Sequence, residues 1–216
     1  MRQALLTGLY PVRSGAYPNH SQVKPGAKSL PHHLKSLGYR TACIGKTHFG
    51  PPESYPFDVM DRSAKKMKPK AGADDEDDGE ELNLQTFERF IAETDQTICA
   101  YLASHEPHGP ITKGDTSAYD PKSFVLAPYL VDTPVTRGAL QGYYAEVGEL
   151  DREVGQVMRI LEKMGKAENT LLFFFSEQQD RMPFAKWTLY NPGIRVRQQG
   201  DEGDTTEREA YEHHPL

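Results

Sequence analysis

Residues 38–50 run Gly38-Tyr-Arg-Thr-Ala-Cys-Ile-Gly-Lys-Thr-His-Phe-Gly50. The part from 39 to 44 is an apolar stretch that follows a glycine, and it predicts a strand. Lys46 and His48 come directly after this strand. In an open α/β sheet, ligands collect beyond the carboxyl ends of the strands. The stretch therefore predicts a central strand that delivers a cation and an imidazole to the functional edge of a sheet.

Two more strands and two helices are predicted farther along the chain. Residues 97–102 predict a buried strand, and residues 170–175, a continuous apolar run between polar residues, predict a strand buried on both faces of a parallel sheet. Residues 85–93 predict a helix, and residues 137–164 predict a long amphipathic helix because apolar residues recur three and four positions apart. Strands that alternate with helices predict an α/β fold with a mostly parallel sheet flanked by helices.

Short elements and loops fill the remaining chain. Residues 3–6 predict a helical turn that ends at Gly8, and Ser29 predicts the cap of a short helix that Gly38 stops. The segments rich in turn-forming residues are expected to be two loops, residues 10–23 and 106–136, and one irregular insertion, residues 53–82.

Composition excludes two classes of partner. The chain has 216 residues, 37% of them hydrophobic, which suffices for one compact domain. Its formal net charge is -6, and nucleic-acid binding needs a basic face, so no nucleic-acid partner is expected. Apolar runs fall well short of the roughly 20 residues that a membrane-spanning helix needs, so no membrane span is expected.

Two local features have structural interpretations. Residues 74–81 place seven carboxylates in eight positions, and such a run predicts a solvated loop because adjacent carboxylates repel one another. Cys43 and Cys99 are the two cysteines of the chain, and each lies in a predicted strand. Both are expected to be buried free thiols.

The opening run Met1-Arg-Gln-Ala-Leu-Leu-Thr-Gly8 and the stretch at 38–50 are followed by Glu106-Pro-His-Gly-Pro110 and by residues 169–178. In this order they resemble signatures of the type I sulfatases, formylglycine-dependent enzymes of the alkaline phosphatase-like superfamily. The resemblance extends to about Val196.

The triplet Ser176-Glu-Gln178 is similar to the heparan N-sulfatase branch of that family. One departure follows at once, because Gln179 stands where that branch has a glycine.

The resemblance implies catalytic roles for five residues. Arg2 would orient and stabilise the formylglycine hydrate, Lys46 would contact the hydrate and the sulfate, and His48 would take a proton from the hydrate. His108 would contact the sulfate and help protonate the leaving oxygen, and Lys186 would be the second sulfate-binding lysine. Fixed cations stabilise the charge on a sulfuryl group in transfer, and histidine suits proton transfer near neutral pH.

The resemblance also implies a calcium ion. Glu177 and Gln178 stand where many sulfatases have Asp-Asn or Asp-His as ligands, and their oxygens suit a hard cation. Both side chains are one methylene longer than those of the family pattern. Lys46, His48, His108, Glu177 and Gln178 each follow a predicted strand, so we expect them to meet at one edge of the sheet.

Expectations for the two ends follow from the resemblance. The family has its modified cysteine four residues before the arginine that matches Arg2, and two aspartate ligands on a still earlier strand. We therefore expect residues 1–196 to be a partial catalytic domain, truncated at its N-terminus, without the first strand and inactive alone. Residues 197–216 are charged and are expected to be a disordered tail from a frameshift. The family is usually exported, which predicts a periplasmic or secreted location.

Three functions are compatible with these motifs. The first is a sulfuric ester hydrolase fragment whose lineage acts on a sulfated carbohydrate or aryl sulfate. The second is a non-catalytic module that binds sulfate or a sulfated glycan, which predicts sulfate binding without turnover. The third is a phosphoesterase of the same superfamily, which would need Asp and His metal clusters such as Asp-x-x-x-His near the long helix.

Overall fold

The computed structural model describes residues 1–18, 20–61, 82–176, 182–186, 188–190 and 197–202. A parallel sheet with the strand order β2-β1-β3 lies at the centre of the molecule. Its strands are β1 (Arg40–Gly45), β2 (Val59–Asp61) and β3 (Ile98–Ala103).

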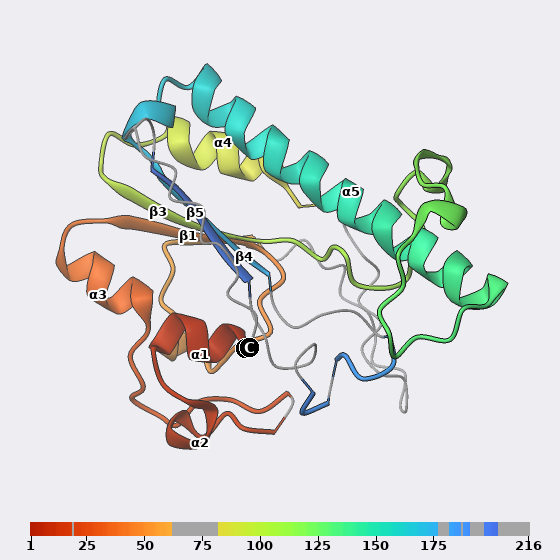
Figure 1. The fold of residues 1–216 in the computed structure, drawn as a ribbon. Helices are drawn as coiled ribbons and strands as arrows, with labels where there is room; N and C mark the ends of the chain where they lie inside the picture. The colour runs from red at the N-terminus through yellow and green to blue at the C-terminus, as the bar shows by residue number, and fades with distance from the viewer. Residues whose placement is uncertain (19, 62–81, 177–181, 187, 191–196, 203–216) are drawn as a thin grey trace.

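Helices cover both sides of this sheet, as Figure 1 shows. On one side lie α4 (Leu84–Ala92) and the long helix α5 (Pro134–Lys163). On the other side lie α1 (Arg2–Thr7), α2 (Pro11–Ser14) and α3 (Leu30–Ser36). The predicted α/β fold with a parallel sheet flanked by helices is therefore confirmed. Among the described helices, none is both long and apolar enough to cross a membrane.

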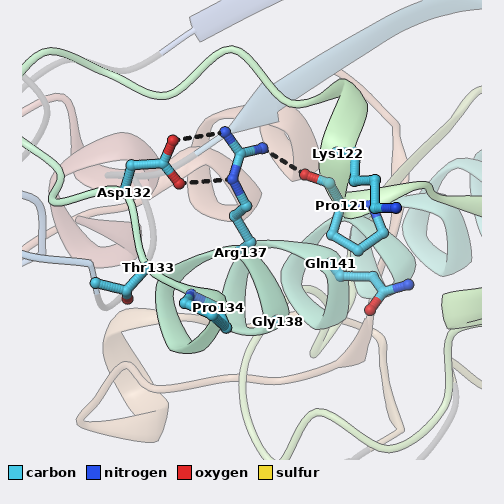
Figure 2. Close-up of a pocket in the computed structure, with 8 residues that line it drawn as sticks. All are labelled: Pro121, Lys122, Asp132, Thr133, Pro134, Arg137, Gly138 and Gln141. Carbon is cyan, nitrogen blue, oxygen red and sulfur yellow. Dashed lines mark hydrogen bonds and ion pairs between the residues drawn. The ribbon is translucent and has the colours of Figure 1, made fainter.

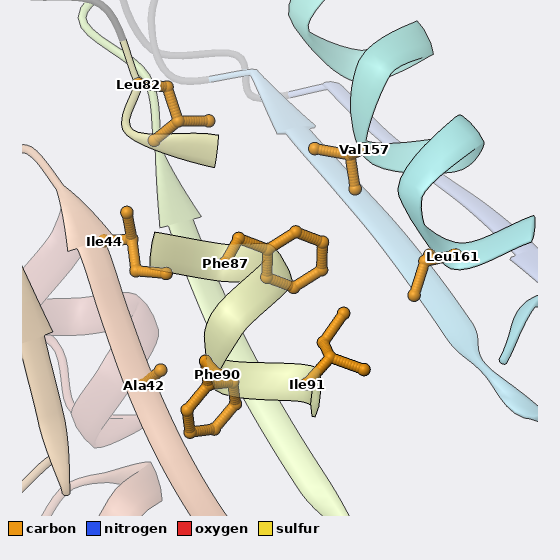
Figure 3. Packing of buried hydrophobic residues seen from close by; sticks show 8 residues of the cluster. All are labelled: Ala42, Ile44, Leu82, Phe87, Phe90, Ile91, Val157 and Leu161. Carbon is orange, nitrogen blue, oxygen red and sulfur yellow. The ribbon is translucent and has the colours of Figure 1, made fainter. Parts of the chain in front are cut away.

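The main core lies between β1, α4 and α5 (Figure 3). Helix α4 presents Phe87, Phe90 and Ile91 from one face, because these positions are three and four apart. Figure 3 shows them between Ala42 and Ile44 of β1 and the side chains of α5. The buried members of this core are Ala42, Ile44, Leu82, Phe87, Phe90, Ile91, Val157 and Leu161.

A second apolar cluster holds the helices on the opposite side of the sheet. Leu6 of α1 packs there with Val23 and the buried ring of Tyr55. Phe49 and Tyr101, which belong to the segments after β1 and within β3, pack against the same cluster. Helix α1 is thereby held next to the segments that leave the sheet.

Strand β4 (Leu171–Ser176) corrects one prediction. It was expected to be buried on both faces of a parallel sheet, but it pairs antiparallel with β5 (Arg197–Glu202) in a separate two-stranded sheet. Leu171, Phe173 and Phe175 on one of its faces are 52%, 48% and 39% exposed. An apolar run satisfies either arrangement, because an antiparallel pair can leave one face uncovered whereas a parallel sheet cannot.

Strand β5 lies within the segment 197–216 that was expected to be disordered. Its main chain pairs with β4 from Arg197 opposite Ser176 to Glu202 opposite Leu171. Pairing of this kind uses backbone groups, so a segment with few apolar residues can still form a strand. Residues 203–216 lie outside the described part of the chain.

Three smaller differences also concern element boundaries. Helix α2 interrupts the predicted loop at 10–23, because Pro11 suits the first helical position and Gly15 ends the helix. Helix α5 begins at Pro134, three residues earlier than predicted, because the Thr133 hydroxyl accepts a hydrogen bond from the Thr136 N–H at 3.1 Å. Short 3₁₀ helices span Pro52–Ser54, Thr116–Ala118, Pro121–Ser123 and Ala167–Asn169.

Strand β2 lies within the segment 53–82, which was expected to be irregular throughout. The strand pairs with β1 over only three residues, and Asp58 just before it anchors the pairing. The Asp58 carboxylate accepts the Thr41 N–H at 2.7 Å and forms an ion pair with Lys35 at 2.6 Å. Residues 62–81, including the acidic run, lie outside the described residues.

The two cysteines are free thiols, as predicted. Cys43 is fully buried in the central strand β1. Cys99 is only partly buried, because it lies on β3 at the edge of the described sheet. Burial still raises the pKa of the Cys99 thiol.

Candidate active site

The register of β1 and β3 brings two predicted functional segments to the same edge of the sheet. Gly45 pairs with Ala103 at the ends of the two parallel strands. The next residue, Lys46, donates its N–H to the Ala103 carbonyl oxygen at 2.8 Å. The chain segments that lead to His48 and to His108 therefore leave the sheet side by side.

Gly45 is the backbone feature that permits this close pairing. Its φ is +95°, a conformation that favours glycine, and a Cβ there would lie less than 3.0 Å from the Ala103 carbonyl oxygen. The Lys46 side chain that follows is buried, with 7% of its surface exposed. A buried cation attracts an anion more strongly than an exposed one, because water screens it less.

His48 lies on a segment that aromatic rings hold in place. Its φ is +47°, and its ring meets the His20 ring edge to face at 5.3 Å between centroids. The adjacent Phe49 packs against Tyr55 at 4.4 Å and against Phe57 at 6.0 Å. These ring contacts hold the main chain next to His48 in place.

Arg2 lies at the start of α1, which the second apolar cluster holds against the same segment. Leu6 of this helix packs in the cluster that Phe49 joins. The Gln3 side chain also donates to the Ser21 carbonyl oxygen at 2.6 Å. The element that carries Arg2 and the segment that carries His48 thus share one packing cluster.

His108 follows β3 in a turn that selects the tautomer of its neutral ring. Its N–H donates to the His105 carbonyl oxygen at 2.9 Å, and its Nδ1 lies 2.8 Å from the Gly109 carbonyl oxygen. A carbonyl oxygen only accepts, so Nδ1 carries the proton and Nε2 is the basic nitrogen of the neutral ring.

A buried cluster beside His108 was missed by the sequence interpretation. Lys113 Nζ lies 2.8 Å from Glu106 Oε1, and the Lys113 N–H donates to Glu146 Oε1 at 2.8 Å. Glu146 of α5 is fully buried and Glu106 nearly so. The available signal was a charge at position 146, three residues after Tyr143 and four before Leu150 on the apolar stripe of the long helix.

Burial raises the pKa of the Glu106 carboxyl from an ordinary value near 4.5 to about 7. The hydrogen bond and charge of Lys113 act in the opposite direction, and the neighbouring Glu146 adds to the rise. The folded chain therefore holds this proton more tightly than the unfolded chain. The stabilisation that results is complete below pH 4.5 and is lost as the pH rises through about 7.

We expect the free energy of unfolding to fall between these two pH values, and Glu106→Gln to remove the part of the fall that this carboxyl causes. Urea unfolding of both chains at several pH values measures the slope. The control is Glu88→Gln, because Glu88 pairs with Lys163 on the exposed side of α4. Equal slopes in the unaltered chain and the Glu106→Gln variant would contradict the assignment.

Lys186 lies in a short described segment beside the loop before α5. Ala185 next to it is buried, and Phe184 meets the Tyr129 ring at 5.8 Å and the Tyr190 ring at 5.1 Å. These contacts anchor the backbone on either side of Lys186. Its convergence with the other four predicted catalytic residues remains a prediction.

The predicted calcium ligands, Glu177 and Gln178, lie outside the described residues. Among the residues that are described, no three or more His, Cys, Asp and Glu side chains gather closely enough to hold a metal ion. Their segment follows β4, which does not pair with β1 or β3 in the described structure. That Glu177 and Gln178 lie at the same edge of the sheet as Lys46 and His108 therefore stays a prediction.

A surface pocket near the start of α5 has a different character (Figure 2). One of its two cationic residues, Arg137, donates two hydrogen bonds to Asp132, at 2.6 and 2.9 Å, and another to the Pro121 carbonyl oxygen. These hydrogen bonds lower the pKa of Asp132. Because the Arg137 guanidinium is already paired with Asp132, it stabilises the loop before α5 and is a poor candidate for anion binding.

Comparison with known proteins adds an independent finding. A family model described as Sulfatase matches residues 1–196. N-sulphoglucosamine sulphohydrolase of Homo sapiens is 31% identical over 221 residues, which cover 89% of this chain and 43% of the human protein. An ulvan-active sulfatase of Formosa agariphila is 26% identical over 233 residues, covering 90% of this chain and 45% of that protein.

The fold has relatives among solved structures. One is a protein from work on the metabolism of multiple glycosaminoglycans by Bacteroides thetaiotaomicron, with a TM-score of 0.63 and 18% identity. The likeness covers 81% of this chain and 48% of that structure. The chain thus spans somewhat less than half the length of each of these three relatives.

Proposed function

This chain belongs to the sulfatase family, and from this premise we propose that it supplies the sulfate-binding and proton-transfer groups of a sulfuric ester hydrolase. The family match covers residues 1–196, which include the signatures around Arg2, Lys46 and His108. The observation that carries the proposal is the pairing of Gly45 with Ala103, from which the segments bearing Lys46, His48 and His108 leave the sheet together.

The proposed roles of the first three residues come from the family pattern, and their charge and position are compatible with these roles. Lys46 is a buried cation at the end of β1, and it would contact the sulfate and the nucleophile. Arg2 would stabilise the same nucleophile from α1, the helix that packs beside the segment of His48. His48 would accept the proton that is released when the covalent sulfate intermediate collapses. Fixed cations would stabilise the charge that spreads over the sulfuryl oxygens.

The remaining roles concern the leaving group and the second lysine. His108 would contact the sulfate and donate a proton to the leaving oxygen once its Nε2 is protonated, since Nδ1 is engaged with Gly109. Lys186 would bind the sulfate from the segment after β4. Both roles are proposals that the family pattern supports.

A calcium ion is also proposed. Glu177 and Gln178 would hold it through their side-chain oxygens, which are the ligands that hard cations prefer. When bound, such an ion would act as a Lewis acid and stabilise the negative charge that develops in the reaction.

The proposed substrate is a sulfated carbohydrate. The human relative is named for N-sulphoglucosamine and the Formosa agariphila relative for ulvan. Both names belong to those proteins. For this chain they support a sulfated sugar as the substrate class.

Sulfate binding tests the anion site directly. Lys46→Met keeps the length and packing of the side chain and removes its charge, so we expect sulfate affinity to fall roughly tenfold or more. Calorimetric titration with sodium sulfate measures the change. The control is Lys163→Met, which removes a lysine at the far end of α5 that pairs with Glu88. Equal sulfate affinity in the Lys46→Met and Lys163→Met variants would contradict the role of Lys46.

Turnover tests the reaction class. A chain extended before Arg2 by the family's first strand with its two aspartates and by the cysteine segment, matured to formylglycine, is expected to hydrolyse an aryl sulfate. Sulfate binding without turnover on any sulfate ester would remove the hydrolase proposal and leave only binding.

A further inference from the structure

We propose that Glu146 of α5 is a positioning residue for His108, because its buried carboxylate fixes the loop that carries this imidazole to the edge of the sheet. The inference rests on the proposed function, since His108 takes part in catalysis only if the site acts on a sulfate ester. No sulfatase signature in the sequence includes position 146.

The first argument is the setting of the carboxylate. The Glu146 side chain is fully buried, and its Oε1 accepts the Lys113 N–H at 2.8 Å and lies 3.5 Å from the Gly114 nitrogen. A buried carboxylate is costly unless donors satisfy it, and here the backbone of the loop supplies donors. The loop and the carboxylate therefore stabilise each other.

The second argument is the continuation of this contact to His108. Lys113, whose backbone meets Glu146, places its ammonium 2.8 Å from Glu106 Oε1. The Glu106 side chain is 2% exposed and lies only two residues before His108. Two polar contacts of Lys113 thus join Glu146 of α5 to Glu106, and the main chain carries the constraint over the two residues from Glu106 to His108.

The third argument is the close approach of the loop to the helix. A Cβ at Gly114 would lie less than 3.0 Å from the backbone of Ala145, the residue before Glu146. One turn earlier in the helix, the Ile111 side chain of the loop fits against Gly142. Backbone packed on backbone has little room to adjust. Because the loop is packed this closely on α5, a change at Glu146 cannot be absorbed between them. It would shift the main chain of the loop, and His108 with it.

The same helix supplies a matched control. Glu153 is also buried and lies two helical turns after Glu146, but its Oε1 accepts the Leu82 N–H at 3.4 Å. Leu82 belongs to the core around α4 and lies close to Gly45 at the end of β1, so Glu153 supports this core and not the loop that Glu146 contacts. Each of the two glutamates has one side-chain oxygen, Oε2, without a hydrogen-bond partner among the described residues. Replacing either glutamate should lower the free energy of unfolding, but only the replacement of Glu146 should affect His108.

The experiment compares Glu146→Leu, Glu146→Gln and Glu153→Leu. Its readouts are the NMR resonances of the His108 ring and the affinity for inorganic sulfate. We expect Glu146→Leu to shift the His108 resonances and to weaken sulfate binding about tenfold, because the loop loses its acceptor. Glu146→Gln keeps an oxygen for the Lys113 N–H, so both readouts should return to within about twofold of the unaltered chain.

Glu153→Leu should leave the His108 resonances unchanged. If it alters His108 as much as Glu146→Leu does, or if neither variant alters it, the positioning role is refuted. The charged and titratable groups around this cluster, which must be followed in the same spectra, are His105, Glu106, His108, Lys113, Glu146, Glu149 and Arg152.

Two further outcomes are separable. If the unaltered chain binds no sulfate, the proposed function fails, and the His108 resonances still decide the role of Glu146. If Glu146→Leu does not fold, hydrogen exchange of the Lys113 amide in the unaltered chain decides it. An amide that exchanges as fast as one in an unstructured peptide would refute the contact.

Discussion

Replacing Gly45 by alanine is expected to lower the free energy of unfolding by about 3 kcal/mol or more, since strain and overpacking act together. The φ of +95° is unfavourable for alanine, and the new Cβ would collide with the Ala103 carbonyl oxygen and approach the Leu82 side chain. Relief of the collision would separate the ends of β1 and β3. Lys46, which bonds to the same carbonyl oxygen, would then move away from the loop of His108.

Urea unfolding and sulfate titration of the same variant measure the two effects. The matched control is Gly38→Ala, because Gly38 precedes β1, has a φ of +82° and leaves open space for a Cβ. This control carries the backbone strain alone and should cost about 1 kcal/mol. Equal losses in the two variants would mean that the contact between the strand ends is unimportant.

Phe90→Ala is expected to destabilise the fold by about 3–5 kcal/mol, the usual range for removing a buried phenylalanine. The Phe90 ring is 2% exposed and lies between β1 and α4 in the main core. Its outer face also meets the guanidinium of Arg40, whose Cζ is 4.9 Å from the ring centroid. The substitution removes core volume and this cation–π contact together.

Equilibrium unfolding in urea, followed by circular dichroism, measures the loss. Phe173→Ala is the control, because Phe173 of β4 is 48% exposed and its removal leaves little cavity. The control should cost far less, since the free energy follows the buried volume that is lost. A loss under about 1 kcal/mol for Phe90→Ala would contradict the core described above.

Much of the fold could be predicted because several elements carry a strong period or a clear boundary signal. The predicted strand at 39–44, and the predicted helices at 85–93 and 137–164, match β1, α4 and α5 to within a few residues. Elements of three or four residues, such as α2 and β2, are too short to show a period. Their existence depends on tertiary contacts, such as the hydrogen bond from Thr41 to Asp58.

Strand β4 shows a limit of a different kind. Its apolar run predicted a strand correctly, but the run is equally compatible with a parallel sheet and with an exposed antiparallel pair. The partner strand decides between them. That partner, β5, lies in a segment whose composition gives no sign of a strand.

For the candidate site, sequence motifs located individual residues but not the supports around them. Lys46 and His108 could be placed after strands, because parallel strands present their carboxyl ends at the same edge. The pairing of Gly45 with Ala103 depends on register, which motifs do not encode. Glu146 was overlooked because a single charge within an apolar helix stripe is easily taken as a surface position.

The close packing of the His108 loop on α5 has a consequence for how this surface can change over generations. Ile111 fits against Gly142, Gly114 against Ala145, and Tyr119 against Gly148. Glycine costs a helix about 1 kcal/mol relative to alanine, so open positions would be free to drift towards larger residues. At Gly142 and Gly148 a larger residue would need a smaller one at Ile111 or Tyr119, whereas Gly114 faces the main chain of Ala145 and cannot be compensated in this way. Substitutions in the loop and in the facing positions of α5 are therefore expected to occur together. A change on one of these two surfaces without the matching change on the other would push the loop away from the helix.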